Sequence, residues 1–375
     1  MSAALNHQFM TVKHVLNHDI MHCTADGVVG NQLYSGRALG ITDPRDIIQL
    51  HPDLQPLWHD IAAHYKRVGL PYSSNVIWNL DLRQLAHHAG FKPSVFFYGP
   101  HESRVWGDSA WFETVQFINS KNNFMALAGE LGVDVPQTRC FDCVAAMTPQ
   151  ARSEVVFPCY LKAAVSVSGV GIYRCADADE LDRALTRFEP DVPIQIQEEV
   201  VAESFLNLQY LVDNGQLMRL AATEQILDGF VHQGNRHPAS HEPWEIVEPM
   251  AQWMAQRGMQ GIFAFDVAVS QTDRGLRFPA IECNPRYNGA SYPTLIAVKM
   301  GIPEWYAVTL STHHRNLADI DLSGLEYDRE TGRGVIIVNW GTVLAGKLML
   351  LIAGPEAYQQ ATRLELEARL DPPLD

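Results

Sequence analysis

A short polar segment, IECNPRYNGASYP at positions 281–293, carries residue types that could do chemistry. Residues two apart in a strand point to the same side, so Glu282 and Asn284 would present two oxygen ligands together. Arg286 would add a fixed cation beside them. This combination suits a divalent metal ion that carries a phosphate group. The alternative for this segment alone is a strand end followed by an ordinary turn.

A third oxygen-bearing side chain lies on the preceding predicted strand. The segments GIFAFDVAVS (261–270) and RFPAIECNP (277–285) flank a polar turn, so we expect an antiparallel hairpin centred near Arg274. That register would place Asp266 opposite Glu282 on one face, whereas a slip of one residue would turn Asp266 away. Asp266, Glu282 and Asn284 match the oxygen preference of Mg²⁺, and Mn²⁺ is compatible with the same set.

A metal–phosphate site also needs residues that hold phosphate. In YLKAAVSVSGVGIYR (160–174), Gly169 and Gly171 permit a tight turn whose backbone N–H groups could cradle phosphate oxygens. Lys162 precedes this turn, and Lys121 could supply a second cation. The alternatives are an ordinary β-hairpin and a solvated helix residue. The segment is not a Walker A loop, because the G-x-x-x-x-G-K-[ST] pattern is missing.

The elements that must position these side chains can be located from hydrophobic spacing and turn residues. We expect helices at 57–70, at 121–132 with Asn119 or Ser120 as the N-cap and Gly132 as the stop, at 176–188 and at 243–259. Strands are expected at 94–99, 155–165, 170–175 and 193–201, with hairpins at 207–227 and 334–354. We interpret FVHQGNRHPASH (230–241) as a mobile loop that touches substrate or nucleotide. A zinc site at its three histidines is the less favoured alternative, because no helical or knuckle spacing supports it.

Composition excludes several classes of protein. The chain has 375 residues with a formal net charge of −15 and no Lys/Arg-rich run, so a nucleic-acid partner is not expected. The six scattered cysteines fit a reducing compartment better than a disulfide framework, and C-x-x-C at Cys140 and Cys143 lacks a second pair for zinc. The first residues lack a secretory pattern, and charged or polar residues interrupt the apolar stretch 334–354. We therefore expect a cytoplasmic protein without a membrane segment.

The order of these parts is more specific than any one of them. A Lys begins a helix, a second Lys precedes a glycine turn, an acidic strand end follows, and then come Asp and E-x-N-x-R. This series resembles the ATP-grasp superfamily of nucleotide-dependent carboxylate–amine ligases and their relatives. The resemblance covers about 119–300, and ECNPRYNG with Asp266 is its most specific piece. It implies an α/β (α+β) fold in which two α+β subdomains clasp ATP, preceded by an α/β N-terminal domain.

The resemblance also implies domain limits and a role for each matching position. The expected domains are 1–118 (N-terminal), 119–197 (small subdomain with a glycine-rich lid) and 198–375 (large subdomain with the metal site and C-terminal hairpin). The residues implied to contact ATP are Lys121, Lys162, Ser168, Gly169, Gly171, Glu198, Glu199, Val201 and Gln225, with Glu198 and Glu199 acting largely through main chain. Asp266, Glu282 and Asn284 resemble the magnesium ligands. Lys162 and Arg286 are the implied catalytic residues, and Arg286, Asn288, Gly289 and Ser291 would meet substrate. The turn departs from the family pattern, because Ser166, Val167 and Ser168 stand where relatives often carry glycine.

The implied activity is amide-bond formation through an acyl phosphate, with release of ADP and phosphate. Small carboxylate and amine molecules would be the substrates, with an amino acid or small peptide favoured by fold-level analogy alone. A homodimer is compatible with this interpretation. The alternatives are another ATP-grasp enzyme, such as a carboxylase subunit or acyl-CoA synthetase, a non-catalytic ATP-binding regulator, and a structural or interaction protein.

Overall fold

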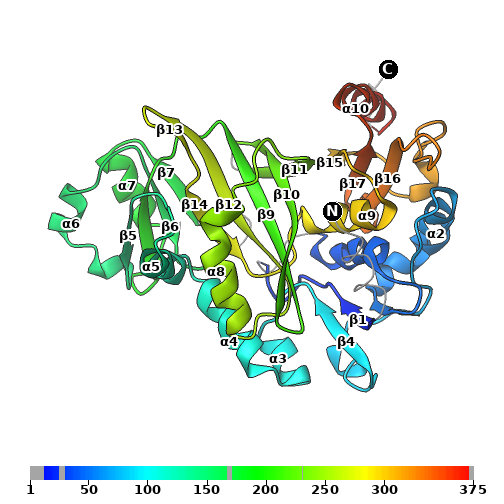
Figure 1. Cartoon of the computed structure of the whole chain (residues 1–375), viewed down its shortest axis with the longest axis horizontal. Helices are drawn as coiled ribbons and strands as arrows, with labels where there is room; N and C mark the ends of the chain where they lie inside the picture. Colours follow the sequence, from blue (N-terminus) through cyan, green and yellow to red (C-terminus); the bar gives the residue numbers. More distant parts are fainter. Residues whose placement is uncertain (1–11, 25–29, 167–170, 230, 371–375) are drawn as a thin grey trace.

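Three β-sheets organise the molecule, which is described by a computed structural model covering residues 12–24, 30–166, 171–229 and 231–370. A small antiparallel sheet forms one lobe, a long antiparallel sheet crosses the middle, and a parallel sheet lies at the opposite end (Figure 1). Within the described ranges, no helix is long and apolar enough to cross a membrane.

The N-terminal region forms the parallel sheet, with strand order β3-β2-β1-β4. Its strands are β1 (Lys13–Asn17), β2 (Ile47–Gln49), β3 (Val76–Ile77) and β4 (Phe91–Val95). The connections contain the 3₁₀ helix η1 (Asn31–Ile41) and the α-helix α2 (Trp58–Arg67), and α3 (Pro100–Trp106) and α4 (Ser109–Ile118) follow the sheet. Parallel pairing requires such crossover connections, and it brings the carboxyl ends of β1 and β4 to one edge.

The small lobe contains the sheet β5-β8-β6-β7 and three helices. Its strands are β5 (Thr138–Phe141), β6 (Cys159–Ala163), β7 (Ile172–Cys175) and β8 (Ile194–Glu198), and its helices are α5 (Lys121–Leu131), α6 (Pro149–Ser153) and α7 (Ala178–Leu185). The Ser120 side chain accepts a hydrogen bond from the Asn123 N–H, which caps α5. Gly132 ends this helix with φ 68°, a conformation that favours glycine. Helix α5 therefore begins at the predicted position and places Lys121 in its first turn.

The central sheet has nine strands in the order β13-β12-β9-β10-β11-β15-β17-β16, with β14 also paired to β12. The strands are β9 (Ser204–Asp213), β10 (Gln216–Asp228), β11 (Val231–His237), β12 (Gly261–Thr272), β13 (Gly275–Arg277), β14 (Ala280–Asn284), β15 (Trp305–Ser311), β16 (Gly334–Asn339) and β17 (Lys347–Ala353). The helices α8 (Trp244–Gln256), α9 (Ser291–Met300) and α10 (Glu356–Leu370) belong to the same part of the chain. Asp266 pairs with Glu282 in the β12–β14 ladder, so the predicted register is confirmed.

The two faces of the central sheet bury different kinds of side chain. Phe263 and Phe265 of β12 pack with Leu206 and Leu208 of β9 in a core that includes residues of α4, α5 and α8. Asp266 of β12 lies on the opposite face, where it meets Asn207 of β9. Successive residues of a strand alternate between faces, so this strand serves the core with one face and the candidate site with the other.

Most expected elements are present, and two predictions need correction. The segment 230–241 was predicted to be a mobile loop, but Val231–His237 forms strand β11 between β10 and β15. The prediction was wrong because the segment is rich in polar residues, which are not typical of a strand inside a sheet. The predicted strand at 94–99 is displaced, because β4 spans Phe91–Val95. The hairpin at 334–354 consists of β16 and β17, joined through a 3₁₀ turn.

Candidate functional site

Lys121, Lys162 and Glu282 meet between the small lobe and the central sheet. Lys121 Nζ lies 3.0 Å from Glu282 Oε2 and donates to Ser166 Oγ at 3.1 Å. Both lysines are 7% exposed, which excludes the alternative that Lys121 is a solvated helix residue. Lys162 Nζ donates to Gln197 Oε1 at 2.6 Å. Two buried ammonium groups therefore share one nearby carboxylate.

Burial and neighbouring charges alter the acid–base properties of this cluster. Burial lowers the pKa of Lys162 to about 8, although Glu282 acts in the opposite direction. Burial alone would raise the pKa of Glu282, but Lys121, Lys162 and Arg286 together lower it. Glu282 is therefore held as a carboxylate beside the two cations, as a phosphate-binding or metal-binding group should be.

Asp266 is held by amide groups from three strands. Its Oδ1 accepts hydrogen bonds from Asn207 and Gln225, each at 2.7 Å, and its Oδ2 accepts one from Asn284 at 2.9 Å. Burial, followed by the charge of Glu282, raises the pKa of Asp266 to about 7. The β-ladder thus fixes two carboxylates opposite each other, and their repulsion would be relieved by a cation.

The residues of this face fit a magnesium ion that also binds phosphate. The amide nitrogen of Asn284 donates to Asp266, so its oxygen is the atom left to act as a ligand. Among the described residues, no group of three or more His, Cys, Asp or Glu side chains could hold a metal by itself. Two carboxylates and one amide oxygen are hard oxygen donors of the kind that Mg²⁺ takes, and this ion commonly completes its coordination with water and phosphate.

Arg286 follows β14 and lies between the carboxylates of the candidate site and a cavity on the side of the N-terminal region. Burial lowers its pKa, and the carboxylates of Glu282 and Asp266 act against that effect. Its Nη1 donates to the Tyr287 carbonyl at 3.3 Å, and no carboxylate lies within ion-pair distance of it in the described part of the chain. The guanidinium group is thus available to an anionic ligand.

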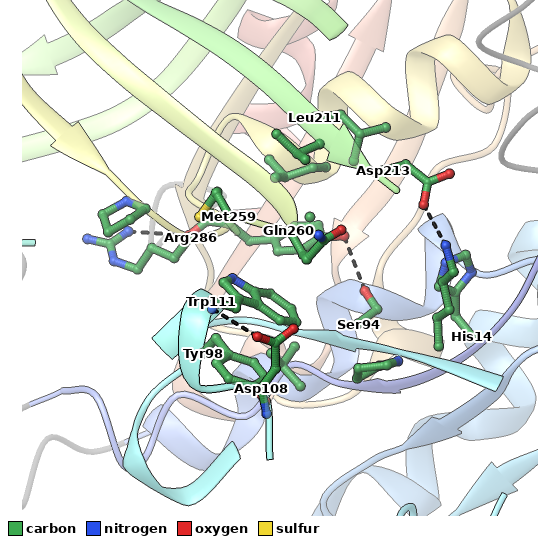
Figure 2. A pocket seen from close by; sticks show the side chains of 18 of the residues that line it. His14, Ser94, Tyr98, Asp108, Trp111, Leu211, Asp213, Met259, Gln260 and Arg286 are labelled. Atoms are coloured by element: carbon green, nitrogen blue, oxygen red, sulfur yellow. Dashed lines mark hydrogen bonds and ion pairs between the residues drawn. The ribbon is translucent and has the colours of Figure 1, made fainter. Parts of the chain in front are cut away.

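A cavity of about 400 Å³ borders Arg286 on the side of the N-terminal region. Tyr98 and Trp111 stack on each other at 3.9 Å in its wall, and Met259 and Gln260 lie across from them (Figure 2). Figure 2 shows the guanidinium end of Arg286 directed away from Met259 and Gln260. Arg286 therefore lines this cavity, whereas Lys121, Lys162 and Glu282 do not.

The loop after Arg286 is tied to the sheet through amide and hydroxyl groups. Asn288 Nδ2 donates to Asn207 Oδ1 at 3.4 Å, and the Asn288 N–H donates to Ser291 Oγ at 3.1 Å. Gly289 lies against His232, since a Cβ on this glycine would come within 2.7 Å of the His232 ring. The structure therefore brings Asn288 and Gly289 to the site, while Ser291 is fully buried at the start of α9.

The remaining predicted nucleotide residues are placed unevenly. Ser168 and Gly169 lie outside the described residues, and Gly171 stands just before β7 with φ 76°. The Glu199 carboxylate accepts hydrogen bonds from Arg174 at 2.5 and 2.9 Å and from Tyr160 at 3.1 Å. The Glu198 carboxylate accepts from the Gln137 N–H, and Val201 is exposed. Both glutamate side chains have protein partners, and the main-chain N–H groups of Glu198 and Glu199 donate to the carbonyls of Gln137 and Pro158.

No model of a protein family matches this sequence, and no curated protein matches it significantly. Solved structures do match over nearly the whole chain. N5-carboxyaminoimidazole synthetase from Staphylococcus aureus, in complex with ADP, is 12% identical with a TM-score of 0.61, covering 96% of each chain. The corresponding ribonucleotide synthetase from Thermus thermophilus is 14% identical with a TM-score of 0.57, covering 97% of this chain and 99% of that one.

An L-amino acid ligase from Bacillus licheniformis is 13% identical with a TM-score of 0.56, covering 96% of this chain and 98% of that one. The chain has the ATP-grasp fold. The fold expected from the order of lysines, glycines and E-x-N-x-R is therefore confirmed. Similarity at this level of identity is evidence for the ATP-grasp fold alone.

Two residues of the candidate site were not expected from the sequence: Gln197 binds Lys162, and Asn207 links Asp266 to Asn288. His232, one of the three histidines of the segment expected to touch substrate or nucleotide, faces Gly289. His232 Nε2 lies 2.6 Å from the Asn235 amide oxygen, so the proton is on Nε2 and Nδ1 is an acceptor. The available signal was alternation, because QIQ and NLQ place polar side chains at every second position of otherwise apolar strands.

Proposed function

We propose that this chain is an ATP-dependent ligase that joins a small carboxylate to a small amine through an acyl phosphate. The observation that carries the proposal is the buried cluster of Lys121, Lys162 and Glu282, with Asp266 opposite Glu282 in the ladder and Asn284 bonded to Asp266. Two partly compensated cations would be stabilised by phosphate oxygens, and the two carboxylates by a divalent cation. The ATP-grasp fold supports this assignment.

In the first step, phosphoryl transfer to the substrate carboxylate, each residue would have a separate role. Lys121 and Lys162 would hold the phosphates, with Gly171 at the base of the proposed lid. A carboxylate oxygen of the substrate attacks the γ-phosphorus, the bond from that phosphorus to the β,γ-bridging oxygen breaks, and ADP leaves. Arg286 would meet the transferring phosphoryl group. Such reactions depend mainly on positioning and charge neutralisation, which this set of cations provides.

Asp266, Glu282 and the Asn284 oxygen would hold Mg²⁺, which when bound neutralises charge on the phosphates. Glu198, Glu199 and Val201 would meet the base. Gln225 donates to Asp266 in the structure, so we assign it to positioning that carboxylate.

In the second step the amine nitrogen attacks the acyl carbon. The bond from that carbon to the phosphate oxygen breaks, phosphate leaves, and the nitrogen loses a proton to give the amide. Asn288 and Gly289 belong to the loop that would border the amine, and Ser291, buried at the start of α9, would fix this loop by accepting a hydrogen bond from the Asn288 N–H. His232 Nδ1 is an unprotonated acceptor beside this loop, so it is the group placed to hold the departing proton.

Nucleotide product analysis tests the proposal. Purified protein would be incubated with Mg-ATP and a pool of amino acids and small carboxylic acids, with Asp266→Asn as the control. We expect pool-dependent ADP and phosphate from the wild type and neither above background from the control. AMP with pyrophosphate would contradict the acyl-phosphate route. Binding of Mg-ATP without turnover on any pool would favour a regulator.

A further inference from the structure

The cavity of about 400 Å³ beside Arg286 has no part in the mechanism proposed above. Its volume lies in the range of pockets that hold small organic ligands. Its lining comes from β4 and the segment after it, from α4, from the carboxyl end of β9 and the amino end of β12, and from the residues around Arg286 (Figure 2). Segments from distant parts of the chain thus enclose one space next to the proposed phosphoryl site.

Most of the residues that line this cavity are aromatic or aliphatic. Tyr98 and Trp111 stack with their ring centres 3.9 Å apart and their planes 15° from parallel, and Met259 lies across from them (Figure 2). Phe96 and Tyr287 add further ring surface. Ring faces and edges, and a polarisable thioether, make favourable contacts with an aromatic ring. The cavity is therefore suited to a flat apolar group.

Most charged side chains of the lining are already compensated by other protein groups. Lys92 Nζ donates to Asp213 Oδ1 at 2.7 Å. The Asp108 carboxylate accepts the Trp111 N–H at 2.9 Å at the start of α4, where the helix dipole stabilises a negative charge. Burial lowers the pKa of His14, so its imidazole is neutral at pH 7. None of these groups needs a charged partner from a ligand, and an uncharged ligand body fits beside them.

Arg286 differs from these residues, because no carboxylate of the described residues lies within ion-pair distance of it. It lines the cavity, and its guanidinium end is directed away from Met259 and Gln260 (Figure 2). The charges of Glu282 and Asp266 act on this guanidinium, so it is within electrostatic reach of the candidate metal site. A ligand whose body fills the cavity would therefore meet the guanidinium with a group that extends beyond the cavity. A carboxylate is the group that suits an arginine there.

We propose that this cavity binds the aromatic body of the carboxylate substrate, which is then an arylalkyl carboxylic acid. The inference rests on the proposed ligase function and narrows its substrate class. The ring would lie between Trp111 and Met259, and a short flexible chain would carry the carboxylate to Arg286. Small acids without a ring would leave the apolar surface uncovered and would bind more weakly.

Saturation-transfer difference NMR without nucleotide measures binding to the cavity by itself. The wild type would be titrated with 3-phenylpropanoate and, separately, with propanoate. We expect the dissociation constant of 3-phenylpropanoate to be at least about tenfold lower, because its ring is removed from water on binding. Equal dissociation constants for the two acids would overturn the proposal.

Gln260→Trp tests whether the ring binds in this cavity, because Gln260 belongs to the lining and an indole there would occupy the space. We expect this variant to bind 3-phenylpropanoate at least about tenfold more weakly than the wild type does. Gln256→Trp is the matched control, because Gln256 is exposed at the end of α8 and lies outside the lining. It should bind as the wild type does. Equal weakening in both variants, or in neither, would overturn the proposal.

Arg286→Met tests the carboxylate end of the ligand. This variant should bind 3-phenylpropanoate about tenfold more weakly, because charge-assisted hydrogen bonds are lost. It should bind the uncharged 3-phenylpropanamide within about twofold of the wild type, since that ligand depends on the cavity alone. An equal loss for the acid and the amide would overturn the assignment of the carboxylate to Arg286.

If Gln260→Trp fails to fold, photolabelling of the wild type with 3-(4-azidophenyl)propanoate decides the question. Covalent label on Trp111, Met259 or Gln260 that 3-phenylpropanoate competes away supports the site. Label on other residues only, or label that is not competed away, overturns it.

ADP release with Mg-ATP, an amine pool and either aryl or small acids separates this inference from the ligase function. Release with aryl acids supports both. Release with small acids alone would overturn the inference and leave the ligase function standing. Release with no acid, while 3-phenylpropanoate still binds, would overturn the ligase function and the substrate role, and leave the cavity as a binding site for aryl acids.

Discussion

Two buried polar clusters of this chain differ in how completely their charged groups are paired within the protein. In the first, His64 of α2 is fully enclosed against the C-terminal hairpin: its Nε2 accepts the Ile337 N–H at 3.0 Å and its Nδ1 donates to Glu326 at 2.7 Å. Arg67 adds two hydrogen bonds of 2.7 Å to the same carboxylate. His64, Glu326 and Arg67 thus satisfy one another.

In the second cluster, at the candidate site, the polar groups do not all find partners within the protein. Lys121 and Lys162 share Glu282, and the buried side-chain amide of Gln195 has no hydrogen-bond partner. Asp266 is held close to another carboxylate. A complete network indicates a structural role, whereas an incomplete one at a junction between lobes indicates that ligands complete it. The comparison separates residues that should affect stability from residues that should affect turnover.

The largest expected effect is the exchange of the two glutamates that anchor these clusters. Glu282→Gln should lower ATP turnover at least about 100-fold, because it removes the proposed metal ligand and the counter-charge of Lys121. Glu326→Gln should leave turnover within about twofold and cost roughly 2 kcal/mol of unfolding free energy, since it weakens charge-assisted hydrogen bonds. For both variants, ADP release measures turnover and urea unfolding measures the free energy of unfolding. Intact turnover in Glu282→Gln would remove the metal assignment.

The second prediction sharpens the contrast between function and stability. Lys162→Met should weaken Mg-AMP-PNP binding about 10- to 100-fold, because phosphate loses a buried cation. Without nucleotide, the same variant should match or exceed the wild-type Tm, since an incompletely paired charge is replaced by an apolar side chain of similar length. Calorimetric titration and thermal unfolding provide the two readouts. An apo protein destabilised by several degrees would mean that Lys162 supports the fold.

A pH dependence should distinguish the satisfied cluster. Burial lowers the pKa of His64, and Glu326 only partly opposes this effect. The unfolded chain therefore binds a proton near pH 6.5 that the folded chain binds only at lower pH, so stability falls as pH drops below about 6.5. Urea unfolding at pH 7.5 and 5.5 should show a steeper loss in the wild type than in His64→Gln, by up to about 1.4 kcal/mol per pH unit. Parallel losses would refute the neutral state of His64.

More of the candidate site than of the surrounding structure could be predicted from the sequence. The strand period and the polar turn near Arg274 were enough to place Asp266 opposite Glu282, and the register is confirmed. Local rules also located α5, since a Ser cap and a terminal glycine bracket it. These features depend on neighbours in sequence, and for that reason they are predictable.

Long-range packing was not predictable in the same way. The β11 strand looked like a loop, because its Gln233, Asn235 and Arg236 are polar, but pairing with β10 and β15 holds it extended. Nothing local indicates that His64 would meet Glu326, 262 residues away. Nor does the local sequence indicate that aromatic rings would surround the Arg37 guanidinium in the folded chain. Tertiary contacts, rather than propensity, decide these positions.

The smallest expected effect concerns the loop that closes the incomplete cluster. A Cβ at Gly289 would come within 2.7 Å of His232 Cε1, so Gly289→Ala must displace that ring or the loop. Because His232 is held by Asn235, we expect a rise of about three- to tenfold in KM for the amine, with kcat changed less. Gly129→Ala is the control: it lies in α5 with open space around it, so it should leave KM unchanged and stabilise the helix slightly. If Gly289→Ala instead left KM for the amine unchanged and raised only KM for ATP, the loop would border the nucleotide, and the amine pocket would have to be sought on another face of the sheet.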